Sequence, residues 1–425
     1  MPFDFYKLIS VRFCFVLAVQ MQAVLLGWQM YLLTKSPLFL GLVGLAEAIP
    51  AIGFALYAGY YVDIRKPIPI LYKLLLVSLF SAGLMLFGQR NDFGLPATVQ
   101  IAALFVSSFL TGAVRAFLHP TIYTLVPAMV PLELLAKSAA IASSTLQVAR
   151  ISGPALGGLL FGYLGVSNCA AIVCGLLGVA LILSMQLTTF PEAANKLDPS
   201  KSVTDDLLLG AKFVWRHSIL FPAMALDMIS VFLGGVTALL PIYVSEILHA
   251  DAAELGYLRA APAIGAFLSS VALVYLPIQK GHGKFMFGAV AGFGVSICVF
   301  ALSRDVWLST LALVASGAFD SISVIIRSSA IQITSPDAIR GRISSVNSVF
   351  VSSSNELGEF QSGVTAALIG PVATAIFGGV SCLVTVVVML FRYPALRALD
   401  LNRLSNSKVD EKSPDSKHIV EQTLQ

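Results

Sequence analysis

Charged residues interrupt the long apolar stretches of this sequence at nine positions. A charged side chain at the centre of a bilayer costs at least about 2.5–3.5 kcal/mol, so such residues pair with one another or face water. Carboxylates and arginines in these surroundings can form ion pairs, exchange protons and bind charged solutes. The nine residues are Glu47, Arg115, Arg150, Asp227, Arg259, Asp320, Arg327, Glu356 and Glu359.

Some of these residues lie close together along the sequence. Arg115 and His119 are four residues apart, and Glu356 and Glu359 are three apart, so each pair shares a helix face. Neighbouring carboxylates repel each other when both are ionised, which favours reversible uptake of one proton. The alternative is that the charges only form ion pairs between helices, with Glu359 solvated near a helix end.

The elements that carry these residues are apolar segments long enough to span a membrane. Hydrophobic residues make up 57% of the 425 residues and charged residues 12%, whereas a soluble domain carries about 25% charged residues. A segment of about 20 mostly apolar residues crosses the hydrocarbon as a helix. We therefore expect an all-α polytopic membrane protein with twelve transmembrane helices. Their expected spans are 9–33, 38–62, 69–88, 98–124, 137–163, 168–188, 219–245, 254–276, 285–303, 306–332, 343–367 and 370–391.

The two halves of the sequence resemble each other. GLAEAIPAIG at 44–53 aligns with GYLRAAPAIG at 256–265, and a second alignment pairs Gly112 with Gly317. Both alignments join helices six apart, which keeps the membrane orientation. The repeat therefore predicts two six-helix bundles in a parallel pseudo-twofold repeat. It also places residues of opposite charge at equivalent positions, Glu47 with Arg259 and Arg115 with Asp320.

The repeat and the polar segments predict the domain boundaries. We expect an N-terminal six-helix bundle at 1–188 and a C-terminal six-helix bundle at 217–394. Between them, residues 189–216 form a cytoplasmic linker with an amphipathic segment, where Trp215 suits the membrane interface. Residues 395–425 are polar and mixed in charge, and we expect a disordered cytoplasmic tail.

Three groups of motifs resemble the major facilitator superfamily. The segment GYYVDIRK contains Gly59, Asp63, Arg65 and Lys66, which resemble the cytoplasmic loop signature, although Ile64 stands where an arginine usually follows the acid. The segment ARISGPALGG resembles the Gly-Pro-rich signature of exporters. Closest are TSPDAIRGRISSVNSVFVSSSNELGEF, LRAAPAIGA and PALRALD, which resemble the bacterial subfamily that includes enterobactin exporters. The resemblance covers nearly the whole chain and implies a multi-pass efflux carrier of the bacterial inner membrane.

The resemblance implies roles for several residues. In this superfamily the first, fourth, seventh and tenth helices line a central cavity, which favours Arg115, Asp227 and Asp320 as cavity residues. We expect Asp320 to be the proton-responsive carboxylate, with its burial opposed by a nearby arginine. That arginine is either Arg115, its counterpart in the repeat alignment, or Arg327, which shares its helix face. The further coupling or cavity residues are Glu47, Arg259, Arg327, Glu356 and Glu359. The gating loop comprises Gly59, Asp63, Arg65 and Lys66, and helix packing is expected of Gly153, Pro154, Gly157 and Gly158.

The first helix carries candidate substrate-binding residues. Gln22, Trp28 and Gln29 place polar and aromatic groups on it, with the two glutamines two turns apart on one face. They are able to bind substrate or to hydrogen-bond to a neighbouring helix.

Other kinds of chemistry lack their required groups. The sequence has no HExxH, no GxSxG, no phosphate-binding loop and no Cys/His ligand cluster, so we expect no enzyme, no cofactor and no metal. The five cysteines lie in apolar segments, and the net charge of +4 does not indicate nucleic-acid binding. An ion gradient is the energy source left. One charge crossing 100 mV releases about 2.3 kcal/mol, enough for a roughly fiftyfold substrate gradient.

These features favour a proton-coupled secondary transporter. We expect a monomer that exports a small amphipathic molecule, such as a siderophore or drug, by alternating access, with protons and the lipid bilayer as its other partners. One alternative is a lipid or lysophospholipid flippase of the same fold. Another is a non-transporting membrane scaffold or sensor, which would tolerate neutralisation of the buried charges.

The distribution of Lys and Arg predicts the membrane orientation. Of 27 such residues, 20 fall in the loops and tails on the side of the N-terminus and three, Lys35, Arg90 and Arg304, on the other side. Positive charge collects in cytoplasmic loops. Reporter fusions after residue 200 and at the C-terminus should therefore both report the cytoplasm. A periplasmic C-terminus would contradict the twelve-helix topology.

Overall fold

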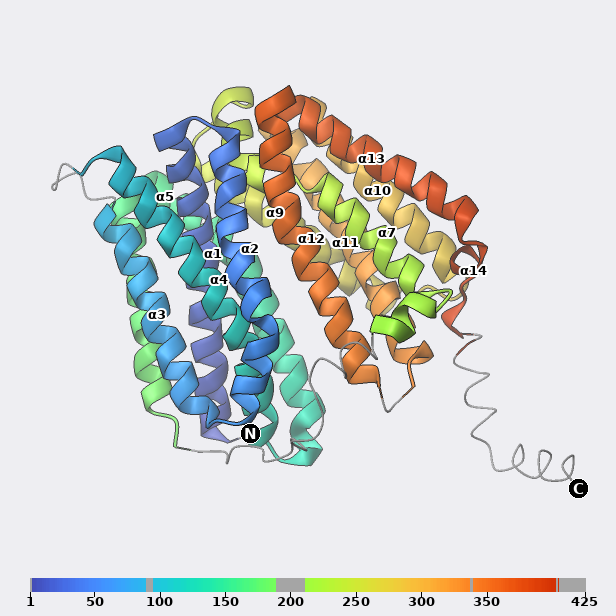
Figure 1. Cartoon of the computed structure of the whole chain (residues 1–425), viewed down its shortest axis with the longest axis horizontal. Coiled ribbons are helices and arrows are strands. Elements are labelled where there is room, and N and C mark those ends of the chain that lie inside the picture. The colour runs from blue at the N-terminus through green and yellow to red at the C-terminus, as the bar shows by residue number, and fades with distance from the viewer. Residues whose placement is uncertain (1, 89–94, 189–210, 337–338, 403, 405–425) are drawn as a thin grey trace, which may run out of the picture.

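The fold is built from helices that run back and forth between two ends of the molecule (Figure 1). The computed structural model describes residues 2–88, 95–188, 211–336, 339–402 and 404, and these contain no strand. The elements are α1 (Phe3–Thr34), α2 (Pro37–Asp63), α3 (Pro67–Gly88), α4 (Ala97–Ala128), η2 (Leu132–Leu134), α5 (Leu135–Met185), α7 (Leu220–Gly234), η3 (Thr237–Leu239), α8 (Leu240–Ile242), η4 (Tyr243–Ile247), α9 (Ala252–Tyr275), α10 (His282–Leu302), α11 (Val306–Thr334), α12 (Arg340–Ile369), α13 (Pro371–Arg392) and α14 (Pro394–Arg397).

Among the described residues, ten segments are long and apolar enough to cross a membrane. One of them lies in α5, whose 51 residues would form a helix of about 76 Å, more than twice the hydrocarbon thickness. Gly165 breaks this helix with a φ of 77°, a conformation that glycine adopts without steric cost. α5 therefore makes two crossings without the intervening loop expected between 163 and 168. With α12, which has 30 residues but many serines, the crossings number twelve.

The seventh crossing is broken, whereas the sequence predicts one continuous helix at 219–245. α7 ends at Gly234, and Gly235 has an extended backbone with ψ of 115°. Short 3-10, α and π turns follow in η3, α8 and η4. The pair of glycines lowers helix stability, and Pro241 lacks the N–H that a continuous helix would need. The segment is hydrophobic throughout, so its sequence predicts a continuous helix and does not indicate this break.

The two halves pack in the same way, as the repeat predicts. In the N-terminal half α4 contacts α2 and α3, and in the C-terminal half α11 contacts α9 and α10. Equivalent glycines allow the closest approaches. A Cβ on Gly112 would lie 2.1 Å from the Glu47 carbonyl oxygen, and one on Gly317 would lie 1.9 Å from the Pro262 carbonyl oxygen. The chain thus has the major facilitator fold, with two six-helix bundles in a parallel repeat.

The segments that join and follow the bundles are only partly described. Of the expected linker, residues 189–210 lie outside the described residues, and 211–216 form a helix in which Trp215 is exposed. The expected tail begins with ordered residues, because the Gly283 N–H donates to the Leu399 carbonyl over 3.0 Å. Residues 405–425 lie outside the described part of the chain.

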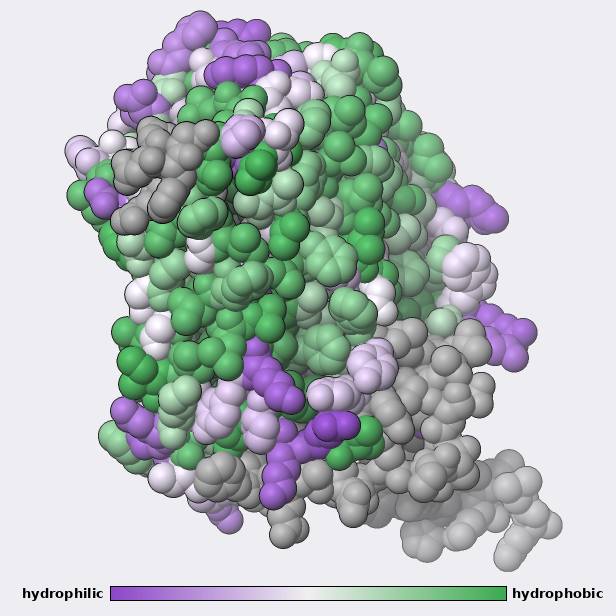
Figure 2. Space-filling view, turned by 60° about the vertical axis from the view of Figure 1, so that its left-hand side comes forward, coloured by the Kyte–Doolittle hydropathy of each residue, from purple (hydrophilic) through white to green (hydrophobic). Residues whose placement is uncertain are grey.

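The bundles meet at the end of the molecule that is opposite the N-terminus. There α2 contacts α12, and α5 contacts α9, while near the N-terminus α2 and α12 lie far apart (Figure 1). A Cβ on Gly158 would be 2.3 Å from the Gly256 Cα, and one on Gly363 would be 2.5 Å from the Gly41 Cα. Hydrophobic residues cover the middle of the face in Figure 2, and hydrophilic residues gather toward both ends, as expected for a protein in a bilayer.

The contact between Gly158 and Gly256 tests whether the bundles separate at this end. Replacing Gly158 with Val should push α5 from α9, since crowding a packed contact costs about 1–3 kcal/mol. That cost should shift the equilibrium toward separated bundles about 5- to 150-fold. The measurement is the rate at which a maleimide labels Ala253→Cys, because Ala253 contacts α5 near Gly162.

The matched control is Gly175→Val in the second crossing of α5, where nothing lies within 4 Å of an added Cβ. Labelling should accelerate in Gly158→Val and stay unchanged in Gly175→Val. Equal rates in both variants would show that the bundles do not separate at this contact.

Candidate functional site

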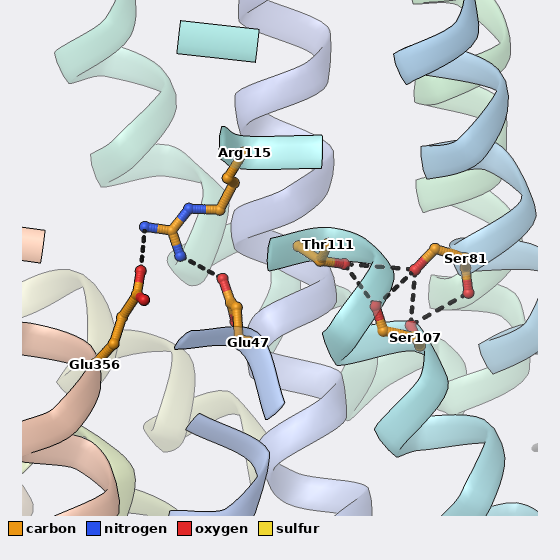
Figure 3. A network of polar contacts seen from close by, with 6 residues as sticks. All are labelled: Glu47, Ser81, Ser107, Thr111, Arg115 and Glu356. Atoms are coloured by element: carbon orange, nitrogen blue, oxygen red, sulfur yellow. Dashed lines mark hydrogen bonds and ion pairs between the residues drawn. The ribbon is translucent and has the colours of Figure 1, made fainter. Parts of the chain in front are cut away.

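An arginine on α4 connects the two bundles. Gly112 lets α4 approach α2 closely, and Arg115 lies one turn further along α4. Its Nη1 pairs with Glu47 Oε1 on α2, and its Nη2 lies 3.2 Å from Glu356 Oε1 on α12 (Figure 3). α2 and α4 belong to the first bundle and α12 to the second. One guanidinium therefore holds carboxylates from both bundles.

Glu356 has one carboxylate oxygen in an ion pair and one without a partner. The residue is 7% exposed, and its Oε2 atom is buried with no hydrogen-bond donor among the described residues. A buried acceptor without a donor is costly while it carries charge. A proton on this oxygen would remove that cost, so Glu356 combines an ion pair with a position for a proton.

Two further charges from the second bundle lie close to this arrangement. Arg259 on α9 donates from Nη1 to the Ala23 carbonyl oxygen of α1 over 2.5 Å. Glu359, one turn after Glu356, lies against α2, where a Cβ on Gly44 would be 3.1 Å from its Oε2. A cavity of about 50 Å³ is lined in part by Glu47, Arg259 and Glu359. Its volume allows a water molecule to reach these charged groups.

We call these five residues the interbundle charge cluster: Glu47, Arg115, Arg259, Glu356 and Glu359. It contains three acids and two bases. With every group ionised it carries one excess negative charge in a region where charges are costly. One bound proton balances the cluster while both arginines keep an acidic neighbour.

A second group of charges lies within the C-terminal bundle. Asp227 on α7 and Arg327 on α11 form an ion pair and are 4% and 2% exposed. Asp320, two turns before Arg327, is half-buried and lies within electrostatic range of both. The structure thus places Asp320 near Arg327, as expected, but Arg115 is paired with Glu47 and Glu356 and not with Asp320.

The repeat does not extend to the ion pairs. Glu47 and Arg115 pair between α2 and α4, but the equivalent residues Arg259 and Asp320 form no ion pair with each other in the described chain. Arg259 reaches across to α1 instead. The reversed charges at equivalent positions therefore have different partners in the two bundles.

The candidate substrate-binding residues of α1 are buried. Gln22 donates from Nε2 to Ser81 Oγ over 3.2 Å and to Ser107 Oγ over 2.8 Å. These serines join Thr111 in the polar contacts between α3 and α4 in Figure 3. This geometry favours helix packing for Gln22 over contact with a substrate.

The other two residues proposed on α1 are also inside the structure. The rings of Trp28 and Phe161 meet edge to face with centroids 6.2 Å apart, which fixes the indole against α5. Gln29 is buried. Neither residue faces an open part of the molecule in this conformation.

The predicted gating loop comprises the last turn of α2 and the residues that join it to α3. The Arg65 guanidinium lies 4.9 Å from the Tyr61 ring centroid, and Lys66 is exposed. Gly59 has nothing within 4 Å of an added Cβ. The side chain of Asp63 lies outside what the structure describes, so its role as a latch stays a prediction.

The predicted packing residues lie where α5 meets two other helices. Cβ atoms on Gly153 and Gly157 would lie 2.5 Å from Gln20 Cβ and 2.9 Å from Met21 Cα of α1. A Cβ on Gly256 would lie 3.0 Å from the carbonyl oxygen of Pro154. The segment therefore packs on α1 within its own bundle and on α9 across the interface.

One contact between the bundles does not follow from the sequence analysis. The Tyr31 hydroxyl at the end of α1 donates to Glu246 in the π turn η4. In the sequence, Glu246 resembles an ordinary acid near a helix end. The feature that could have identified Glu246 is the adjacent break in the seventh crossing, because π turns are frequent at functional sites.

Comparisons with known proteins agree with this architecture. The transmembrane secretion effector family matches residues 10–420. The chain is 24% identical over 405 residues to an enterobactin exporter, EntS, of Shigella boydii serotype 4, and 23% identical to EntS of Escherichia coli O1:K1, covering 92% of each chain.

Solved structures show the same fold. A POT family transporter bound to 5-aminolevulinic acid superposes with a TM-score of 0.73 at 13% identity, over 93% of this chain and 97% of that one. The nucleoside transporter NupG gives a TM-score of 0.73 at 14% identity, over 94% and 100%. These similar proteins are transporters and not enzymes. Since the family match covers most of the sequence, the chain belongs to the transmembrane secretion effector family of major facilitator transporters.

Proposed function

We propose that this transporter exports a small amphipathic molecule, such as a siderophore or drug, by alternating access coupled to proton entry. The observation that carries the proposal is the Arg115–Glu356 pair, which joins the two bundles while leaving one buried oxygen of Glu356 without a donor. The names of the relatives support export. Their sequence identity of 23–24% to this chain is too low to identify its substrate.

The conformation fits one half of a transport cycle. The bundles touch at one end and lie apart at the end where the N-terminus lies (Figure 1). If that end is cytoplasmic, as the Lys and Arg distribution predicts, the structure faces inward. Direct pairing with Arg115 favours the ionised form of Glu356 and opposes the effect of burial, which favours the protonated form. A proton brought in on Glu356 would be released in this conformation.

When the transporter changes to the outward-facing form, the bundles separate at this end, and Arg115 and Glu356 on opposite bundles must move apart. The Arg115 side chain is 45% exposed, so solvent screens its charge and separating the pair costs less than the about 3–5 kcal/mol of a fully buried ion pair. In the outward-facing form water reaches the cluster, and a proton on Glu356 removes its charge. With Glu356 protonated, the three acids and two arginines of the interbundle charge cluster carry no excess charge as the empty carrier closes again, which couples proton entry to export.

The first prediction for this mechanism concerns Glu356→Gln. The amide cannot exchange a proton, so proton-driven transport should fall at least about tenfold while exchange without a gradient persists. The measurement is uptake of enterobactin or ethidium into everted vesicles with an acidic lumen. Glu133→Gln in the exposed turn η2 is the matched control and should transport normally.

The outcome that contradicts this role is concentrative uptake by the folded Glu356→Gln variant at the wild-type rate. Loss of both uptake and exchange, with normal abundance, would instead show that the carboxylate is needed to hold the bundles together. The ratio of the two activities therefore separates coupling from structure.

Asp320 is the second candidate for proton coupling, because it lies near a buried aspartate and arginine. We expect Asp320→Asn to keep at least about half of the proton-driven uptake, since Asp227 and Arg327 still pair within the bundle. The same vesicles measure it. Loss of proton-driven uptake with exchange retained would assign the coupling role to Asp320 in place of Glu356.

A further inference from the structure

A stripe of polar side chains continues from the interbundle charge cluster along α4. Arg115, His119 and Tyr123 follow one another at intervals of four residues, so they share one face of the helix. The His119 and Tyr123 rings lie with centroids 4.8 Å apart and an angle of 40° between their planes. Tyr123 is 69% exposed, and His119 is also exposed. The stripe runs toward the end of the molecule where the N-terminus lies.

Two arginines from neighbouring helices lie beside this stripe. Gly153 brings α5 against α1, and Arg150 lies one turn before Gly153. Arg150 is within electrostatic range of Arg12 on α1 and of Arg115, and His119 is within range of both Arg12 and Arg150. Three helices of the first bundle therefore bring basic side chains to one place.

No acid balances these basic groups within the described part of the chain. Neither Arg12, His119 nor Arg150 has an ion pair or a hydrogen bond there, although Arg115 one turn away has two carboxylates. Like charges at this range repel each other. Arg150 and His119 are exposed, so a solute has access to them.

We propose that Arg12, His119, Tyr123 and Arg150 form a binding site for an aromatic anion, a ring that carries a carboxylate or a comparable acidic group. Guanidinium groups bind carboxylates through paired N–H donors. The exposed tyrosine and histidine rings offer a surface for stacking. The site rests on the proposed export function and names the class of substrate that would enter from the N-terminal end.

The position of the site connects anion binding to proton uptake by Glu356. His119 lies about 6 Å along the helix axis from Arg115. An anion that advances by one helix turn would meet the guanidinium that now holds Glu356. Competition for Arg115 would free Glu356 to accept a proton when the cluster opens to the other side.

The test compares two ligands of the same shape and different charge. Salicylate and salicylamide are titrated by calorimetry into the full-length protein in detergent. Wild type should bind salicylate more tightly than salicylamide. Arg12→Gln and Arg150→Gln should weaken salicylate binding about three- to tenfold, as expected for one partly hydrated charged contact. Their affinity for salicylamide should not change.

The control is Arg392→Gln, which removes one exposed arginine from the far end of α13, and it should bind salicylate like wild type. Equal binding of the two ligands by wild type, or equal salicylate binding by all variants, would overturn the anion site. The assay uses no proton gradient. If the anion site is overturned, the export proposal still stands or falls separately, by proton-driven ethidium uptake in wild-type vesicles.

Discussion

The ion pair between Arg115 and Glu356 is the interaction on which the proposed transport mechanism depends. It forms because Gly112 lets α4 lie against α2, so that the arginine reaches past its own bundle. Charges at this depth are costly unless paired. Glu356 is the buried partner of the pair, so a change in the arrangement of the bundles there is favoured when its carboxylate finds another partner or takes up a proton. A carboxylate with one bonded and one free oxygen suits that exchange.

The remaining contacts between the bundles allow such a change. Gly158 faces Gly256, and Gly41 faces Gly363, so backbones touch without interlocking side chains. Polar links are few at this interface in the described chain, chiefly Arg259 with a backbone carbonyl and Tyr31 with Glu246. Two bundles that meet through glycine backbones and a few polar contacts can rock against each other more easily than two bundles with interdigitated side chains.

The sequence predicts the helices and their pairing better than the contacts of single charges. Long apolar runs, the repeat and the glycines at equivalent positions determine the fold. Which acid meets Arg115 depends on how far each helix is rotated and tilted, and the sequence does not show this. Asp320 stands opposite Arg115 in the repeat alignment, but Glu356 lies within reach of it. The broken seventh crossing escaped prediction because its glycines and proline occur within a hydrophobic run.

In the proposed mechanism, Glu356 is ionised when the bundles touch opposite the N-terminus and protonated when they separate there. Infrared difference spectroscopy of the purified protein measures this directly, with Gly158→Val used to favour the separated form. A protonated carboxyl band should appear in Gly158→Val relative to wild type and be missing when Glu356→Gln is added. Persistence of the band in the double variant would assign the proton to another acid and contradict the account.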